Sequence, residues 1–408
     1  MSNLPELFPR RFAPDEPLER RPNPFEQWLW WEEQANLPGF RISTEPLELS
    51  VAEVPASAVS VALDRSAPAD LVARFLRGDR VRIPRHPLNR DTAVPFHDAP
   101  ERERWSARFT SSRTLAVPVP EGESLFSVKL ATDHPHPDWH QPEKTRLREE
   151  ANWTLAWVDL VDRADRWLGG PDPELQLIRE QIVILVHDSE AGCLVRDLRR
   201  FRDGHHYLPG AALPFVGPQL ARQLGADFAD FFGEHFAASV GRAKARLFAR
   251  YGLWFDTPNP QNLLLQLDRN LAPTGGIVFR DLGDTYCATD ALACEARPWT
   301  RLEKEIRPET RVSFWAFDES GEHSIAPEVL SEWCERHDRA YFSELASWFP
   351  ELAGGRELDP GAGDIDGAEL ARLWSEALRT PEGLKAIARS FASRRLGSGR
   401  AQRSSWKR

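Results

Sequence analysis

The sequence predicts an α+β fold in which a central antiparallel β-sheet region precedes a mainly helical C-terminal part. Pairs of short apolar runs, separated by turn residues, recur before residue 284 and are typical of β-hairpins. Apolar residues at helical spacing cover residues 218–250 and 326–349. The 408 residues exceed the usual size of one domain, so several subdomains are expected.

Composition limits the class of protein. The chain is 41% hydrophobic and 28% charged, which is typical of a globular protein with a large core. Its net charge of −10 argues against nucleic acid as a main partner. No leader-like apolar segment or membrane-length apolar run is present, and the four cysteines show no CxxC. We therefore expect a cytoplasmic protein with reduced thiols and no membrane partner.

The first 100 residues predict a Pro-rich arm followed by a small α/β cap. Pro5 to Pro24 exclude regular structure, and the aromatic residues at 25–31 predict a short amphipathic helix that clamps the arm to the body. Residues 45–63 predict strand, and 67–77 a helix capped by Ser66 and ended by Gly78. A further strand and a Pro-rich turn are expected within 79–100.

The rest of the chain predicts a β-rich part over 101–216 and a mainly helical part over 217–395. Strand 181–187 should pair with 192–198, and the residues from His205 to Pro218 read as a loop. The remaining segments are helices over 143–168, 218–250, 326–349 and 367–378, a last helix opened by Thr380-Pro381, and a Gly/Ser-rich, basic, disordered tail over 396–408.

A hairpin of strands 114–119 and 125–130, with a turn at Glu121-Gly122, carries polar residues at one end. Ser111, Ser112, Arg113 and Thr114 open its first strand, and Lys129 lies near the end of the second. Hydroxyls, a guanidinium and an ammonium together suit a polyphosphate. The alternative for these residues is a polar strand entry and a lysine whose head reaches solvent.

Two further segments carry candidate ligands. Arg146 and Arg148 lie in the first turn of helix 143–168, where the helix dipole disfavours cations unless an anion compensates them; the alternative is solvated arginines. His134, His136 and His140 have metal-binding side chains, but three prolines and the absence of a completing ligand favour a surface loop.

A second hairpin is expected from the apolar runs 263–267 and 277–279. Its geometry brings the residues that flank the strands, Asn262 and Asp281, to one end of the pair. An amide oxygen and a carboxylate are hard oxygen ligands, which Mg²⁺ takes alongside nucleotide phosphates. The alternative is an ordinary hairpin with a capping Asn and a solvated Asp.

The order of these pieces resembles the NRPS-independent siderophore synthetases of the aerobactin-synthetase (IucA/IucC) type. The resemblance runs from about Arg80 to Asp284. It rests on Ser-Ser-Arg-Thr at 111–114, Lys129, an Arg in the next helix, Val-Arg-Asp at 195–197, PGAALP at 209–214, a long helix, Tyr-Gly at 251–252, Pro-Gln-Asn at 260–262 and FRDLGD at 279–284.

The resemblance implies an enzyme that uses ATP and Mg²⁺ to adenylate a citrate-like or related carboxylic acid and condenses it with an amine or hydroxylamine. Residues 101–216 would then be a nucleotide-binding subdomain, and 251–284 a metal and ATP hairpin in a palm-like subdomain. Arg113, Lys129 and Asp281 would be the catalytic residues. ATP would be bound by Ser111, Ser112, Arg113, Thr114, Lys129, Arg146, Arg148, Gln261 and Asn262, and the metal by Asp256, Asn262 and Asp281.

Two positions depart from the family pattern, and two other functions stay open. Asn259 stands where the family has His, and Asp256 where it usually has Glu. An Asn followed, after a hairpin, by a metal-binding Asp also occurs in kinase-like small-molecule phosphotransferases. The chain lacks the His of a catalytic H-x-D before Asn262. A catalytically inactive binding homologue is the third option, and a homodimer is left open.

Overall fold

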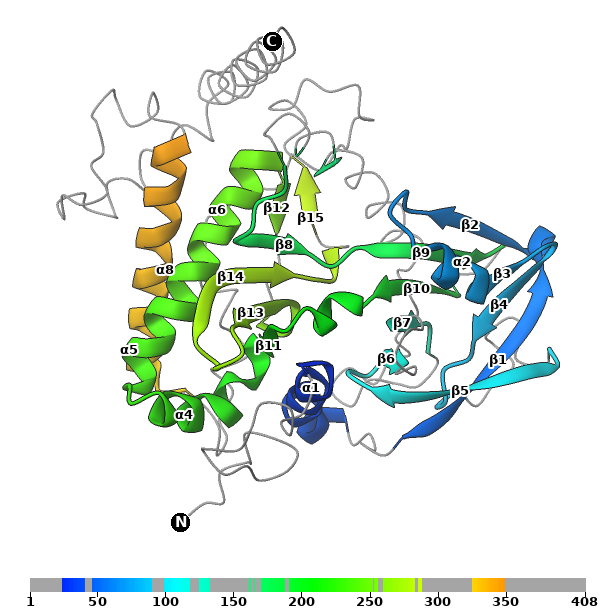
Figure 1. Ribbon diagram of the computed structural model, residues 1–408, viewed down its shortest axis with the longest axis horizontal. Helices are drawn as coiled ribbons and strands as arrows, with labels where there is room; N and C mark the ends of the chain where they lie inside the picture. The colour runs from blue at the N-terminus through cyan, green and yellow to red at the C-terminus, as the bar shows by residue number, and fades with distance from the viewer. Residues whose placement is uncertain are drawn as a thin grey trace, which may run out of the picture.

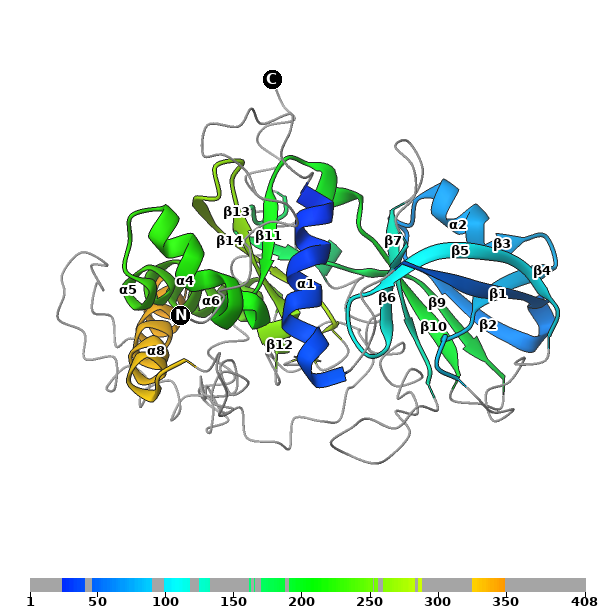
Figure 2. The same cartoon turned by 90° about the horizontal axis from the view of Figure 1, so that it is seen from below.

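The computed structural model describes residues 24–40, 46–89, 99–117, 125–132, 161–162, 165, 170–187, 191–251, 253–255, 260–282, 285–287 and 325–348. The fold is α+β, as the sequence predicts. A large curled antiparallel sheet lies on one side of the molecule, and a smaller sheet covered by helices lies on the other (Figures 1 and 2).

The large sheet contains nine strands in the order β2-β9-β10-β7-β6-β5-β1-β4-β3, and every neighbouring pair is antiparallel. Its strands are β1 (Leu47–Pro55), β2 (Val59–Leu63), β3 (Leu76–Arg77), β4 (Arg80–Pro84), β5 (Glu101–Phe109), β6 (Thr114–Val117), β7 (Phe126–Leu130), β9 (Glu180–Val186) and β10 (Gly192–Asp197). The expected hairpins 114–130 and 181–198 are therefore both present. The subdomain boundary expected at residue 100 falls between β4 and β5, which both pair with β1.

The small sheet has the order β11-β13-β14-β8. Its strands are β11 (His206–Pro209), β13 (Leu263–Leu267), β14 (Pro273–Phe279) and β8 (Leu175–Leu177), and only β8 runs parallel to its neighbour among these four. The expected 263–279 hairpin is the β13–β14 pair. β12 (Leu253–Phe255) and β15 (Thr285–Cys287) form a separate two-stranded ribbon.

The described helices are α1 (Pro24–Phe40), α2 (Ala69–Phe75), α4 (Leu213–Gln223), α5 (Phe228–Phe232), a π-helical segment (Gly233–Ala238), α6 (Ser239–Tyr251) and α8 (Pro327–Trp348). Helices α4, α5, α6 and α8 bury their apolar faces with the small sheet in one core, whereas α2 packs into the core of the large sheet through Leu71 and Phe75. No helix in the described part of the chain is long and apolar enough to cross a membrane.

Helix α1 lies where the two sheets meet (Figure 2). Phe25, Trp28 and Leu29 pack in one cluster with Ala116 of the large sheet and Leu264 and Val278 of the small sheet. The Trp28 ring stacks on Phe201, which lies in the connection from β10 to β11, with 4.5 Å between ring centroids. The hydrophobic burial of this helix therefore helps to hold the two sheets together.

The structure corrects the expectations for residues 67–77 and for the residues between His205 and Pro218. The helix expected at 67–77 begins at Ala69, with Pro68 rather than Ser66 at its N-cap, and Leu76–Arg77 is strand because it pairs with β4. The loop expected between His205 and Pro218 contains β11 and the start of α4, since β11 finds its partner in β13, far along the chain.

The single helix expected at 218–250 is divided. Gly225, with φ +70°, ends α4, and the side chain of Asp227 then caps α5 by accepting hydrogen bonds from the Ala229 and Asp230 N–H groups. The helices expected at 367–378 and from Thr380, the 396–408 tail, the N-terminal arm and most of helix 143–168 lie outside the described residues.

Candidate functional site

Lys129 occupies the interior of β7, where all five residues of the strand are buried. Only 5% of its surface is accessible, and it lies opposite Thr114 of β6 and Leu194 of β10. A buried ammonium is costly unless a counter-ion compensates it. Its counter-ion comes from the other sheet.

Asp281 supplies that counter-ion from the turn directly after β14. The Lys129 Nζ donates to Asp281 Oδ1 at 2.8 Å and to Oδ2 at 3.1 Å. Asp281 has φ +58°, an uncommon backbone conformation for a residue other than glycine, and one that Asp and Asn adopt more readily than most. The pair links residues 152 positions apart and joins the two sheets directly.

Arg196 of β10 extends this pair into a network. Its Nη2 donates to Asp281 Oδ1 at 2.9 Å, and its Nε donates to Glu180 Oε1 at 2.9 Å. Glu180 is 1% exposed, whereas the Asp281 side chain is 29% exposed. Of the two carboxylates that Arg196 contacts, Asp281 is therefore the one that solvent or a ligand can reach. Glu180 lies behind Arg196.

The two carboxyl groups have opposite electrostatic environments. Burial acts to raise the pKa of Asp281, but the charges of Lys129 and Arg196, with a smaller effect of Arg113, outweigh it and hold that pKa below its ordinary value. Burial raises the pKa of Glu180, against the opposing charge of Arg196. Asp281 is therefore ionised at neutral pH and holds the cations together.

The polar segment at 111–114 lies at the same end of the large sheet. Thr114 begins β6 opposite Lys129, and the Arg113 carbonyl accepts a hydrogen bond from the Leu130 N–H at 2.9 Å. His86 Nε2 is 2.8 Å from the Ser112 carbonyl oxygen. Ser111 to Thr114 are all half-buried. The structure thus brings this predicted group next to Lys129 and within electrostatic reach of Asp281.

The end of the β13–β14 hairpin places Gln261 and Asn262 beside the same turn. Leu263 pairs with Phe279, and the Asn262 carbonyl accepts a hydrogen bond from the Arg280 N–H at 3.0 Å. Gly210 of the PGAALP motif approaches so closely that a Cβ there would lie 2.7 Å from the Pro260 carbonyl oxygen. The PGAALP, Pro-Gln-Asn and FRDLGD motifs therefore meet in space.

Arg280 anchors this turn to α1. Its guanidinium pairs with Glu32, with 2.5 Å between Nη1 and Oε1 and 3.0 Å between Nη2 and Oε2, and its Nε donates to the Gln261 carbonyl at 2.8 Å. The adjacent Glu33 pairs with Arg108 of β5. Two consecutive carboxylates of α1 thus contact different sheets: Glu32 binds the end of the small sheet, and Glu33 binds the large sheet.

Four residues of this arrangement were missed as site residues by sequence reasoning: Glu32, Glu180, Arg196 and Arg280. Arg196 appeared only as part of a motif, and Glu180 stands at the entry of an apolar strand. A charged residue within an otherwise apolar, buried strand is the signal that could have found both. Nothing in the local sequence pairs Glu32 with Arg280, because 248 positions separate them.

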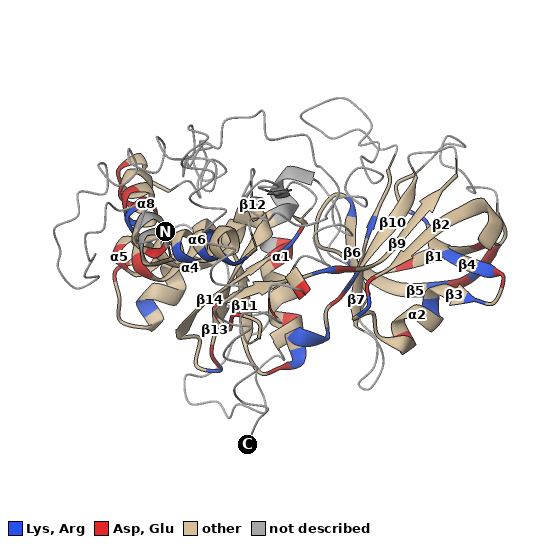
Figure 3. Ribbon diagram, turned by 90° about the horizontal axis from the view of Figure 1, so that it is seen from above, with Lys and Arg blue, Asp and Glu red and all other residues tan. Residues whose placement is uncertain are grey.

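Several predicted site residues cannot be compared with this geometry. Arg146, Arg148, Asp256 and Asn259, with the loop that carries His134, His136 and His140, lie outside the described residues. Figure 3 shows Lys and Arg segments meeting Asp and Glu segments around β6 and β7, where the sheets approach each other.

The donor set fits phosphate more directly than a resident metal. Arg113, Lys129 and Arg196 form a cationic group at Asp281, and such groups bind phosphate oxygens through charge-assisted hydrogen bonds. Among the described residues, no group of three or more His, Cys, Asp or Glu side chains could hold a metal. Asp281 and Asn262 offer Mg²⁺ few oxygen ligands, so these residues fit the metal only when phosphates supply others.

Comparisons with known proteins give structural neighbours only. No protein-family model matches the chain, and no curated protein sequence matches it. Aerobactin synthetase IucC from Klebsiella pneumoniae is 15% identical, with a TM-score of 0.48 over 81% of this chain and 64% of that one. ATP-bound aerobactin synthetase IucA from Klebsiella pneumoniae is 13% identical, with a TM-score of 0.46 over 86% and 62%.

The petrobactin biosynthesis protein AsbB from Bacillus anthracis is 13% identical, with a TM-score of 0.45 over 85% of this chain and 66% of that one. Kinase domains match with TM-scores of 0.30 and 0.32. This chain spans less than two thirds of the length of each of the two aerobactin synthetases and of AsbB. The two aerobactin synthetases are of the type that the motifs at 111–284 resemble, and at such identities and TM-scores the likeness transfers no activity.

Proposed function

We propose that this protein is an ATP-dependent ligase that adenylates a carboxylic acid, citrate-like or related, and condenses it with an amine or hydroxylamine. The observation that carries the proposal is the Lys129–Asp281–Arg196 network between the two sheets, with Arg113 beside it. A buried lysine and two arginines around one accessible carboxylate form a site for a polyanion.

The first role of these side chains is to bind and orient phosphates. The Ser111, Ser112 and Thr114 hydroxyls, with the Arg113 guanidinium, would hold phosphate oxygens at the start of β6. Lys129 would exchange one oxygen of Asp281 for a phosphate oxygen, since one ammonium can donate three hydrogen bonds. Arg196 would stay on Asp281 and keep its carboxylate in place.

The second role is to favour departure of pyrophosphate. When bound, ATP with Mg²⁺ supplies an activated phosphorus and a leaving group. In our proposal the metal would be oriented by Asp281, Asn262 and Asp256. The phosphates would be oriented by Asn262, Gln261, Arg146 and Arg148. The cations would stabilise negative charge as the substrate carboxylate attacks the α-phosphorus and the bond to pyrophosphate breaks. The amine then displaces AMP from the acyl group.

Product analysis tests this proposal against its alternatives. The protein should convert ATP to AMP and pyrophosphate in the presence of its acid and amine, and should catalyse acid-dependent exchange of labelled pyrophosphate into ATP. A screen of carboxylic acids by this exchange identifies the acid. ADP as the product would instead indicate a phosphotransferase. Neither product, across the acids and amines screened, would indicate a non-catalytic protein.

Asp268→Asn gives a matched control for Asp281→Asn. Asp268 lies at the opposite end of the same hairpin, where its Oδ1 accepts hydrogen bonds from the Asn270 and Ala272 N–H groups. Both variants lose one carboxylate of the hairpin. Only Asp281→Asn should abolish pyrophosphate exchange; equal exchange in the two variants would contradict the proposed site.

A further inference from the structure

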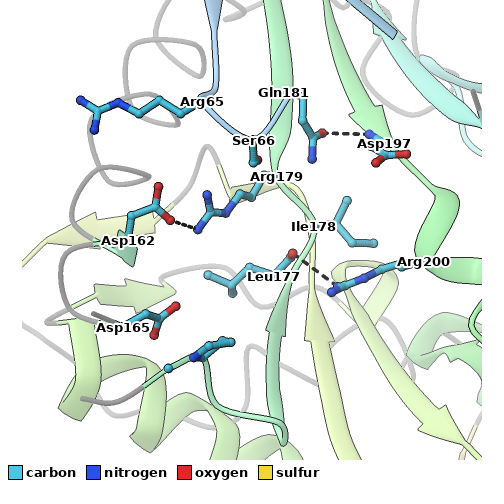
Figure 4. Close-up of a pocket in the computed structure, with 12 residues that line it drawn as sticks. Arg65, Ser66, Asp162, Asp165, Leu177, Ile178, Arg179, Gln181, Asp197 and Arg200 are labelled. Carbon is cyan, nitrogen blue, oxygen red and sulfur yellow. Dashed lines mark hydrogen bonds and ion pairs between the residues drawn. The ribbon is translucent and has the colours of Figure 1, made fainter. Parts of the chain in front are cut away.

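A cavity of about 850 Å³ lies beside β9 and β10, the strands that carry Glu180 and Arg196 of the network. Gln181 and Asp197 line it, and they directly follow Glu180 and Arg196 in β9 and β10. Figure 4 shows residues that line the cavity. Lys129, Glu180, Arg196 and Asp281 are not among its lining residues, so the cavity is separate from the site proposed for ATP.

The carboxylates that line this cavity already have cationic or hydroxyl partners. Asp162 pairs with Arg179, and both groups are at the cavity wall. Asp165 accepts hydrogen bonds from the Tyr251 hydroxyl at 2.7 Å and from Arg250 at 3.1 Å. Asp197 accepts from Arg199 Nε at 3.1 Å. The negative charges of these carboxylates are thus compensated by Arg179 at the cavity wall and by Arg250 and Arg199, which do not line the cavity.

The hydrogen-bond donors of the cavity are less well satisfied. Within the described part of the chain, the Arg200 guanidinium makes one hydrogen bond, a 3.4 Å contact from Nη1 to the Leu177 carbonyl oxygen. Gln181 Oε1 accepts from the Asp197 N–H at 2.8 Å, which fixes the amide orientation and leaves its Nε2 donors without a described acceptor. The Ser66 hydroxyl likewise has no described partner.

We infer that this cavity binds a small oxyanion, a phosphate or a carboxylate, held by Arg200, Gln181 and Ser66. This is a second ligand site, beyond the ATP site of the proposed function. A partly buried guanidinium keeps its charge and gains most from an anion that can accept two of its hydrogen bonds. Burial lowers the pKa of Arg200 from its ordinary value and outweighs the favourable effects of Tyr207, Asp203 and Asp197.

The test is calorimetric titration of the full-length protein with inorganic phosphate and, separately, with succinate. Wild type should bind one equivalent of at least one of them, and the preferred probe distinguishes the two anion classes. Arg200→Met should weaken binding about tenfold or more, as loss of charge-assisted hydrogen bonds requires. Arg202→Met removes a nearby exposed arginine that does not line the cavity, and this variant should bind the anion like wild type.

The Gln181→Glu variant keeps the oxygen that accepts a hydrogen bond from the Asp197 N–H. It replaces the donating amide NH₂ group by a second oxygen, which only accepts. It should fold normally and repel the anion, and Arg200→Lys should recover part of the affinity lost in Arg200→Met. If Arg200→Met fails to fold, Gln181→Glu decides the question alone. No saturable binding of either probe, or equal binding in wild type and both cavity variants, overturns the inference.

Parallel titrations with ATP keep this inference apart from the proposed function. Arg200→Met and Gln181→Glu should bind ATP like wild type, whereas Arg113→Gln should lose ATP and keep the small anion. Loss of phosphate binding in Arg113→Gln alone would place the anion at the ATP site and overturn the second site. If the wild-type protein binds the small anion but does not bind ATP, only the proposed function is overturned.

Discussion

Glu32 and Arg280 form a buried ion pair, with 2.5 Å between Oε1 and Nη1, that ties α1 to the residue directly before Asp281. The Glu32 side chain is fully buried. Asp281 holds a strained backbone conformation at this point, so its neighbours must fix it in place. Helix α1 precedes Arg80, where the resemblance to the siderophore synthetases begins, and it supports the turn at Asp281 from outside that region.

Glu32→Gln should therefore destabilise the protein strongly. It leaves the Arg280 guanidinium buried without a counter-ion, which costs roughly 3–5 kcal/mol for a buried pair. Glu33→Gln is the matched control, because its partner Arg108 is 31% exposed and water can replace the lost contact. Urea unfolding measures both; equal losses in the two variants would mean that the Glu32 pair has no special role.

Asp281→Asn should lower both stability and activity. Asn accepts the φ of +58° and keeps the side-chain shape, so the turn should persist. Lys129 and Arg196 lose the charge they share, and the loss of charge-assisted hydrogen bonds costs about 1.5–3 kcal/mol. Melting temperature and pyrophosphate exchange measure the two effects. A fully active variant would remove Asp281 from the mechanism.

The same carboxylate predicts a dependence of stability on pH. The folded-state pKa of Asp281 lies below the ordinary value of 3.8, so its ionised form stabilises the fold above that value. This contribution is lost as the pH falls below about 3.8, when the unfolded chain takes up the proton first. Urea midpoints between pH 7 and pH 3 should fall less steeply for Asp281→Asn than for wild type or Asp268→Asn. Parallel curves for all three proteins would contradict the assigned charge network.

ATP with Mg²⁺ should raise the melting temperature. A ligand at about one hundred times its dissociation constant stabilises the folded state by roughly 2.7 kcal/mol. Arg113→Gln should reduce ATP affinity about ten- to a hundredfold through loss of a charge-assisted phosphate contact. Arg104→Gln removes an exposed arginine of β5 and should leave the ATP effect unchanged. The absence of any shift in wild type at millimolar ATP would argue against every nucleotide-dependent role.

Much of the fold follows from local pattern. The β6–β7, β9–β10 and β13–β14 hairpins were predictable because short apolar runs and turn residues lie next to each other in the chain. β11 was not, since its partner β13 lies more than fifty residues away and its own residues resemble a loop. The division of the 218–250 helix was also missed, because helical spacing of apolar residues continues through the break made by Gly225 and Asp227.

The sequence by itself determined which side chains could carry the chemistry: Ser111 to Thr114, Lys129, Asn262 and Asp281 are polar residues at the ends or in the interior of apolar strands. Only the tertiary structure decided that Lys129 pairs with Asp281, that Arg196 and Glu180 lie behind that pair, and that Glu32 fixes Arg280. The physical reason is that a buried charge requires a counter-ion nearby in space, and no local pattern tells which distant charge will provide it.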